Sequence, residues 1–255
     1  MERMANTTIK YISKPVLRRP ILIEGLPGIG NVGKITADFL ASSLKAEKFA
    51  SIYSEHFPPQ VMLDDECVVH MACNDLYFAQ NVGKNKVDVV FLLGEYQGTT
   101  ANGQYVLCKD LMDEVFLRMD VSVIYTLGGY GTGLMADKPR TFGAVTKSSM
   151  KTFLEENGVF FSPGEPGAGI LGASGLLLGM GDINDIDAAC LMGETSGYFV
   201  DHKSAIALLT VLESILGLDL DKSDLELKSH QIDELTAKVK EYEVNQKKEN
   251  LGYIG

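Results

Sequence analysis

The chain has 255 residues, 45% of them hydrophobic, which suffices for one large core or for one core with an appendage. Its net charge of −11 argues against duplex nucleic acid and anionic membrane surfaces as partners, because both are negatively charged. Four cysteines without C-x-x-C spacing, scattered histidines and no long apolar run lead us to expect a cytoplasmic protein with reduced thiols, no bound metal and no membrane segment.

Short apolar segments alternate with segments of helical character along most of the chain. The predicted strands are 21–24, 49–53, 67–72, 76–80, 87–94, 121–128, 159–161 and 188–193. The predicted helices are 31–44, 103–119, 146–156 and 201–216. Nearly continuous Val, Ile and Leu in several strands predict an α/β fold with a mostly parallel sheet sandwiched by helices. A predicted hairpin about Asn74 and Asp75 makes the sheet mixed.

The sequence changes character after Gly217, which predicts a core domain over 1–217 and a helical extension over 218–255. Residues 218–249 contain no Gly or Pro. Apolar residues recur there with the spacing of a coiled coil, at Leu225, Ile232, Leu235, Val239 and Tyr242. Two interpretations stay open: a helix that packs on its own domain, and a helix that pairs between subunits or projects outward.

A glycine-rich turn follows the first predicted strand, in the segment "GLPGIGNVGK" over 25–34. It matches the dinucleotide-binding pattern G-x-G-x-x-G at Gly28, Gly30 and Gly33, and Glu55 lies where a ribose-binding acid is expected. It also nearly matches the phosphate-binding P-loop, with Lys34 as the phosphate-contacting lysine.

Several features weaken the nucleotide interpretation. Pro27 precedes the first glycine, and Ile35 stands where a P-loop has its magnesium-binding hydroxyl. Similar glycine patterns recur twice, at Gly131 and Gly133 and at Gly167, Gly169 and Gly172. Each of the three segments follows a predicted strand, so all are expected along one edge of the sheet. There they either line one crevice or allow close packing of backbones, and Lys34 is then expected to be an exposed first-turn lysine.

Reactive side chains are concentrated in the segment "GETSGYFVDHKSA" over 193–205. Asp201 is the expected N-cap of the following helix, with Ser204 at the third helical position. His202 and Lys203 then fall in an exposed first turn. Glu194, together with Glu95 after another strand and Lys34, forms the candidate site of the alternative enzyme interpretation.

Four segments taken together are more specific than any single motif: "EGLPGIGNVGKITADFL", "GYGTG", "PGAGILGASGLLLGMG" and "LMGETSGYFVDHKSA". In order and wording they resemble the archaeal branch of the proteasome-assembly-chaperone-2 family over roughly 20–250. The resemblance implies a phosphorylase/hydrolase-like α/β fold. It also implies a chaperone without catalytic residues or cofactor that binds proteasome α-subunits as a homo-oligomer, alone or with a paralogue. The alternative is a nucleotide-binding, ATP-grasp-like enzyme that uses the glycine loop.

The same resemblance gives a meaning to the apolar C-terminal segment "NLGYIG" over 250–255. Proteins that bind proteasomes often end in a hydrophobic residue, a penultimate Tyr and a last residue. Here Tyr253 is third from the end, with Leu251 and Ile254 as apolar neighbours. We expect these three residues to contact the partner, and the other interpretation is a tail that packs on its own oligomer.

Overall fold

The computed structural model describes residues 2–3, 7–164, 167 and 169–232. The strands are β1 (Glu2–Arg3), β2 (Thr7–Tyr11), β3 (Ile21–Gly25), β4 (Glu47–Ser54), β5 (Val61–Leu63), β6 (Val69–Met71), β7 (Asn74–Val82), β8 (Val87–Gly94), β9 (Val123–Gly131), β10 (Thr141–Val145), β11 (Val159–Phe160) and β12 (Asp187–Thr195). The helices are η1 (Ile29–Asn31), α1 (Val32–Ser43), α2 (Ala101–Leu111), the π-helical η2 (Met112–Phe116), α3 (Ser149–Glu156), α4 (Gly172–Ile183) and α5 (His202–Leu216).

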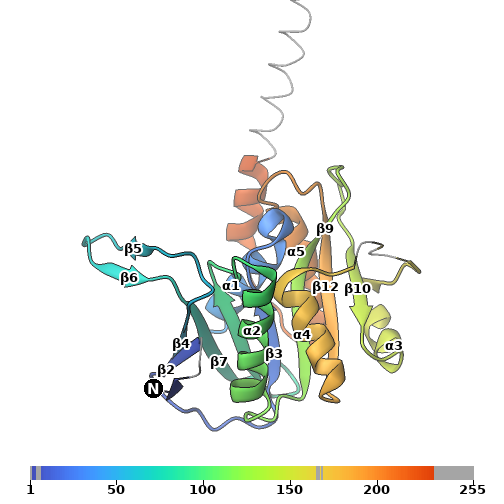
Figure 1. The fold of residues 1–255 in the computed structure, drawn as a ribbon. Helices are drawn as coiled ribbons and strands as arrows, with labels where there is room; N and C mark the ends of the chain where they lie inside the picture. Colours follow the sequence, from blue (N-terminus) through green and yellow to red (C-terminus); the bar gives the residue numbers. More distant parts are fainter. Residues whose placement is uncertain (1, 4–6, 165–166, 168, 233–255) are drawn as a thin grey trace, which may run out of the picture. The chain divides into compact units, whose positions relative to one another are not determined.

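Ten strands form one mixed sheet in the order β1-β2-β4-β7-β8-β3-β9-β12-β10-β11. The four central strands, β8, β3, β9 and β12, are parallel to one another. Helices α2 and α4 cover one face of the sheet, and α1 and α5 cover the other (Figure 1). The predicted α/β class and the mixed sheet between helices are therefore confirmed, and the parallel pairings are concentrated in the centre.

The central strands are buried on both faces, because the helices that connect parallel strands cover both sides of the sheet. Six consecutive residues of β8 and eight of β12 are buried, as expected for strands with helices above and below. The largest core cluster lies on the face of α2 and α4, where Leu22, Val90 and Ile124 pack with Leu107 and Leu177. This packing fixes the carboxyl ends of β3, β9 and β12, where two glycine segments begin, after β3 and at the end of β9, and the third leads into α4.

The predicted hairpin about Asn74 and Asp75 is wrong. Strand β6 pairs with β5 in a separate two-stranded sheet, while β7 pairs with β4 and β8 in the large one. Asn74 is buried and begins β7, so it is not in a turn. Its side-chain amide donates to the carbonyl oxygen of Tyr96 at 2.9 Å. Its polar side chain therefore fastens the start of β7 beside the end of β8.

The chain divides into two units, residues 1–220 and residues 221–255. In the first unit α5 ends at Gly217, whose left-handed φ of 66° suits a helix C-terminus. In the second unit, residues 223–232 are helical and include Leu225 and Ile232 of the predicted heptads. The remaining heptad positions lie outside the described residues. Within the described part of the chain, no helix is long and apolar enough to cross a membrane.

Candidate functional site

The three glycine segments meet at the carboxyl ends of β3, β9 and β12, where they line a crevice of about 510 Å³. Five of the eight glycines predicted for this place line the crevice: Gly28, Gly131, Gly167, Gly169 and Gly172. The main chain also contributes Gly128 and Gly129, which the sequence patterns did not single out. Crevices outside the carboxyl ends of parallel strands are the usual place for ligands in such sheets.

The other three predicted glycines have structural tasks beside the crevice. A Cβ on Gly33 would lie 2.2 Å from the carbonyl oxygen of Leu127, so only glycine lets α1 approach β9 so closely. Gly30 and Gly133 adopt positive φ angles of 62° and 73°, which glycine adopts without strain. Crevice lining and close backbone packing, the two open interpretations of the glycine segments, therefore occur side by side.

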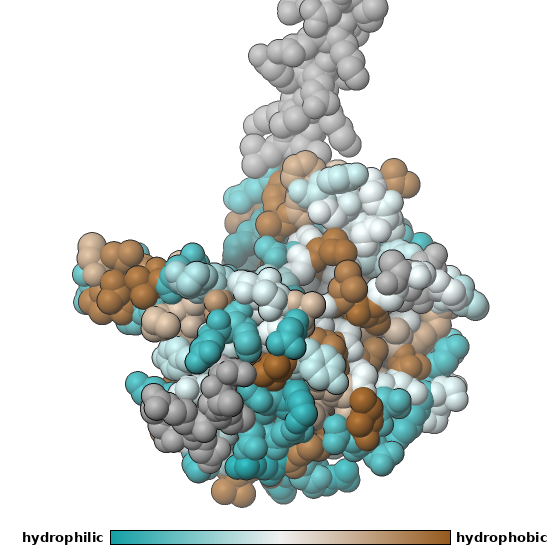
Figure 2. Space-filling view, in the orientation of Figure 1, coloured by the Kyte–Doolittle hydropathy of each residue, from teal (hydrophilic) through white to brown (hydrophobic). Residues whose placement is uncertain are grey.

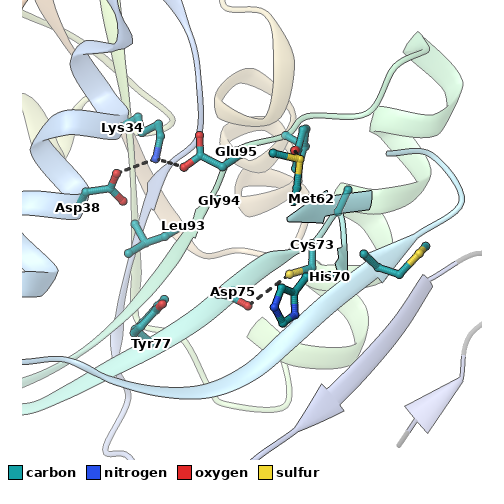
Figure 3. A pocket seen from close by; sticks show the side chains of 13 residues that line it. Lys34, Asp38, Met62, His70, Cys73, Asp75, Tyr77, Leu93, Gly94 and Glu95 are labelled. Carbon is teal, nitrogen blue, oxygen red and sulfur yellow. Dashed lines mark hydrogen bonds and ion pairs between the residues drawn. The ribbon is translucent and has the colours of Figure 1, made fainter. Parts of the chain in front are cut away.

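Lys34 does not point into this crevice. Its ammonium lies 2.7 Å from Asp38 Oδ2 and 2.8 Å from Glu95 Oε1, at one side of a different pocket of about 360 Å³ (Figure 3). The expectation of an exposed first-turn lysine is wrong, because its side chain is only 16% exposed. Burial works to lower the pKa of Lys34, but the hydrogen bonds with Asp38 and Glu95 outweigh it and raise that pKa above 10.5.

The pocket around Lys34 is rich in carboxylates. Burial raises the pKa of Asp38 above its ordinary value even though Lys34 opposes that rise. Asp75 lies near Cys73 (Figure 3), and it is paired with Lys48 at 2.8 Å. Lys34 and Lys48 are thus each paired with carboxylates, and the carboxylates would repel a polyphosphate here. Among the described residues, no group of three or more His, Cys, Asp or Glu side chains is placed to hold a metal.

Glu194, the third residue of the alternative enzyme site, lies elsewhere. Its carboxylate forms a bidentate pair with the Arg140 guanidinium, with both N–O distances at 3.0 Å. Hydrogen bonds from Arg140 hold the pKa of Glu194 below its ordinary value, against the effect of burial. The pair joins β12 to the start of β10, so Lys34 and Glu95 come together and Glu194 does not join them.

The segment before α5 holds the start of that helix in place. Asp201 caps the helix by accepting a hydrogen bond from the Ser204 N–H at 2.9 Å, as the sequence predicts. Its other carboxylate oxygen accepts one from the Thr195 hydroxyl at 2.6 Å. His202 and Lys203 are half-buried, so the expectation of an exposed first turn is wrong.

The strand that would carry a ribose-binding acid is also misplaced. In a dinucleotide-binding fold the strand after the glycine turn lies next to the first strand. Here β4, which ends just before Glu55, is separated from β3 by β7 and β8. Glu55 therefore cannot serve the glycine turn in the way that the sequence spacing suggested.

A β-hairpin arm, residues 61–71, extends from the body and was missed in the sequence (Figure 1). On its inner face, Met62 Sδ accepts a hydrogen bond from the Tyr96 hydroxyl at 2.9 Å. Its other face consists of four largely exposed apolar residues, Val61, Leu63, Val69 and Met71. Figure 2 shows this concentration of hydrophobic surface on the arm. Exposed apolar clusters of this kind are typical of protein contacts.

The predicted tail residues Leu251, Tyr253 and Ile254 lie outside the described residues. Their role stays a prediction.

Comparison with known proteins agrees with this fold. The PAC2 family profile matches residues 22–240. An uncharacterised protein of Methanocaldococcus jannaschii is 32% identical, with 97% of this chain and 98% of that protein covered.

Two solved structures from Pyrococcus furiosus are similar. PbaB, described as an archaeal proteasome activator, is 34% identical with a TM-score of 0.87, covering 93% of this chain and all of that one. PbaA, described as an archaeal homolog of proteasome-assembly chaperone, shares the fold at 24% identity with a TM-score of 0.76, covering 98% of this chain and all of that one. The chain belongs to the PAC2 family.

Proposed function

We propose that this protein binds proteasome α-subunits as a homo-oligomer and assists their assembly without catalysing a reaction. The observation that carries the proposal is the similarity to PbaB along nearly the whole chain. The match to the PAC2 family and the fold shared with PbaA support it. The paired states of Lys34 and Glu194 support a non-enzymatic role, because neither residue offers an uncompensated charge to a substrate.

The arm supports contacts between copies of the chain. An isolated two-stranded ribbon is at best marginally stable in water, so covering its apolar face would stabilise it. Next to that face, the tip of the arm carries Asp64, Asp65 and Glu66, so a basic surface on a partner would complement it.

Such a counterpart exists on the same chain. A hollow of about 220 Å³ is lined by apolar side chains that include Phe49 and Met119, together with Lys14 and the ion pair of Arg118 with Glu114. The strongly exposed Val16 follows Pro15, which also lines this hollow. We assign the arm of one copy to this hollow on the next, a head-to-tail contact of the kind that closes rings.

Measuring the molar mass by light scattering tests this contact. Leu63→Ser combined with Val69→Ser should reduce the mass of the oligomer, while Leu134→Ser, at another exposed apolar position, should leave it unchanged. Lys14→Glu should weaken the assembly, and a second change, Asp65→Lys, should restore it. An oligomer unaffected by the arm variants would rule out this contact.

Several copies would also multiply the effect of weak C-terminal tails on a multi-subunit partner. Recombinant α-subunits should be retained by the full chain and much less by a chain that ends at residue 250. Unchanged retention would remove Leu251, Tyr253 and Ile254 from the interface. No retention by the full chain, and no faster α-subunit assembly in its presence, would refute the proposed function.

Activation of the finished proteasome is a second candidate, because PbaB is described as an archaeal proteasome activator. The two roles separate in one pair of assays. An assembly factor accelerates the association of free α-subunits, whereas an activator raises peptide hydrolysis by assembled proteasomes.

A nucleotide-binding enzyme is the alternative interpretation that the sequence left open. ATP, ADP and NAD, with and without magnesium, should leave the thermal unfolding midpoint unchanged. A ligand at about 100 times its dissociation constant would add about 2.7 kcal/mol and would be readily seen.

A further inference from the structure

The crevice among the glycine segments has walls without charge. The described residues that line it include no Asp, Glu, Lys, Arg or His. Leu26, Ile29, Ile170 and Met192 provide apolar side chains, and Tyr130 adds an aromatic ring. Backbone N–H groups of glycine turns can hold an anion, but no described side chain in these walls supplies positive charge to neutralise one. The lining suits an uncharged, mostly apolar molecule, and its volume falls within the usual range for small-molecule sites.

Gln97 holds the walls of the crevice in place. Its side-chain amide donates to the carbonyl oxygen of Pro27 at 2.7 Å and accepts from the N–H of Ala173 at 2.9 Å. One side chain therefore ties the first glycine segment to the start of α4. Each polar end of Gln97 makes one of these bonds, which fixes the orientation of its side chain in the crevice wall.

Ser174 contributes a hydroxyl group to the lining of the crevice. The Ser174 hydroxyl donates to Glu24 Oε2 at 2.8 Å, and Glu24 Oε1 accepts from the N–H of Leu26 at 3.0 Å. Glu24 is completely buried, and its strand register places it beside Thr126, which in turn lies beside Cys190. When Glu24 is ionised it accepts the Ser174 proton, and the serine oxygen then presents its lone pairs to the crevice as a hydrogen-bond acceptor.

We propose that this crevice binds a small, uncharged, mostly apolar molecule that carries one N–H or O–H donor, which Ser174 Oγ accepts. The apolar walls supply most of the affinity, and the donor fixes the orientation. An unsatisfied polar group is costly in such a site, so a ligand without the donor binds less well. None of the described residues that line the site belongs to the arm, so the proposal stands or falls independently of the arm contact.

Indole and indene test the proposal, because they share a shape while only indole has an N–H. Titration of the full-length protein by calorimetry should give a dissociation constant for indole on the order of 1 mM or below. Indene should bind at least about threefold more weakly. Inorganic phosphate should produce no saturable signal. Absence of saturable indole binding, or equal affinity for the two rings, would overturn the proposal.

A matched pair of glycine variants locates the site. Gly128 lies on β9, and a Cβ there would lie 3.7 Å from Met192 Cγ, an ordinary contact, so Gly128→Leu places its side chain into the crevice. A Cβ on Gly179 of α4, outside the crevice, would have open space. Gly128→Leu should weaken indole binding at least about tenfold, and Gly179→Leu should not change it. Undiminished binding in folded Gly128→Leu would place the ligand elsewhere and refute the site.

Ser174→Ala tests the acceptor directly. It should lower the affinity for indole to that for indene and leave the affinity for indene unchanged, an outcome that a general loosening of the fold would not produce. A preserved preference for indole would exclude Ser174 as the acceptor. Should the alanine variant unfold because Glu24 loses a partner, the glycine pair still decides whether the crevice binds the ring.

Discussion

Two hollows flank the glycine-rich segment over residues 25–34, and they differ in kind. On one side Gly28 lines the uncharged crevice, and on the other Lys34 lines a pocket with three carboxylates (Figure 3). In a phosphate-binding loop the glycine backbone and the lysine must converge on one ligand. Here they serve different hollows. The sequence motif is present, but its geometry separates the parts that a phosphate would need together.

The two hollows also treat buried charge differently. Lys34 and Asp38 compensate each other beside the carboxylate-rich pocket. Under the crevice, Glu24 accepts hydrogen bonds from Ser174 and from the N–H of Leu26, which are neutral groups, and burial raises its pKa to about 7. The charged pocket therefore keeps its ions at neutral pH, while the floor of the crevice holds a carboxyl group close to half protonated.

The largest expected effect is a loss of stability, and it should separate Gly33, which packs against β9, from Gly28, which lines the crevice. Gly33→Ala would force a Cβ against the Leu127 backbone, which cannot give way like a side chain, so we expect a loss on the order of 3 kcal/mol or more. Gly28→Ala should change stability by less than about 1 kcal/mol, because a Cβ there meets open space and φ is −155°. Urea unfolding measures both, and equal losses would contradict this division of roles.

Glu24→Gln should remove a pH dependence of stability. Between the ordinary pKa of 4.5 and the folded value of about 7, the unfolded chain loses its proton while the folded chain keeps it. Stability therefore falls as pH rises through this window, by about 3 kcal/mol for a shift of 2.5 units, and the loss is absent below pH 4.5. The glutamine variant should lack this fall in urea titrations across the same window. Identical pH profiles for both proteins would show that Glu24 does not titrate as inferred.

Arg140→Ala should cause a smaller, oppositely pH-dependent loss. The pKa of Glu194 is lowered chiefly by hydrogen bonds from Arg140, so the pair contributes above the ordinary pKa of 4.5 and its contribution is lost as pH falls through the folded value. The variant should be less stable than the wild type at neutral pH and approach it in acid. Lys147→Ala, which breaks a more exposed pair with Asp187, serves as the control and should cost less. A pH-independent loss would point to the lost stacking of Arg140 on Phe142 instead.

Lys34→Met should have the smallest effect. It breaks pairs whose carboxylates are 43% and 65% exposed, so a loss of about 1 kcal/mol or less is expected. If Lys34 held a phosphate, the wild type would be stabilised by ATP and magnesium and the variant would not. A thermal unfolding series with both proteins checks this, and a wild-type shift that the variant loses would restore the nucleotide interpretation.

Much of the fold could be predicted from sequence periodicity. The central strands are long apolar runs, and Asp201 with Ser204 marks the start of α5. The predicted hairpin about Asn74 was wrong because Asn is common in turns but also occurs buried, with its side chain bonded to a neighbouring strand. The sequence alone does not distinguish these two uses. Strands β5 and β10 were missed because they are short, and a strand depends on its pairing as well as on its own residues. Strand β6 lies within the predicted strand 67–72, but the partner assigned to it was wrong.

Only part of the candidate site could be predicted from the sequence. Glycine spacing located the crevice rim, since each segment follows a strand end. It could not separate Gly33, which packs on β9, from Gly28, which lines the crevice, because that depends on the path of α1. Glu24 carried one weak signal, a charged residue at the end of an apolar strand, and its contact with Ser174 spans 150 positions. Such long-range contacts leave no local pattern.

Native mass spectrometry of the full-length chain mixed with recombinant proteasome α-subunits tests the central functional claim most directly. Complexes that contain more than one copy of this chain together with α-subunits are the predicted result. A spectrum with only monomers of this chain and free α-subunits would contradict both the homo-oligomer and the partner.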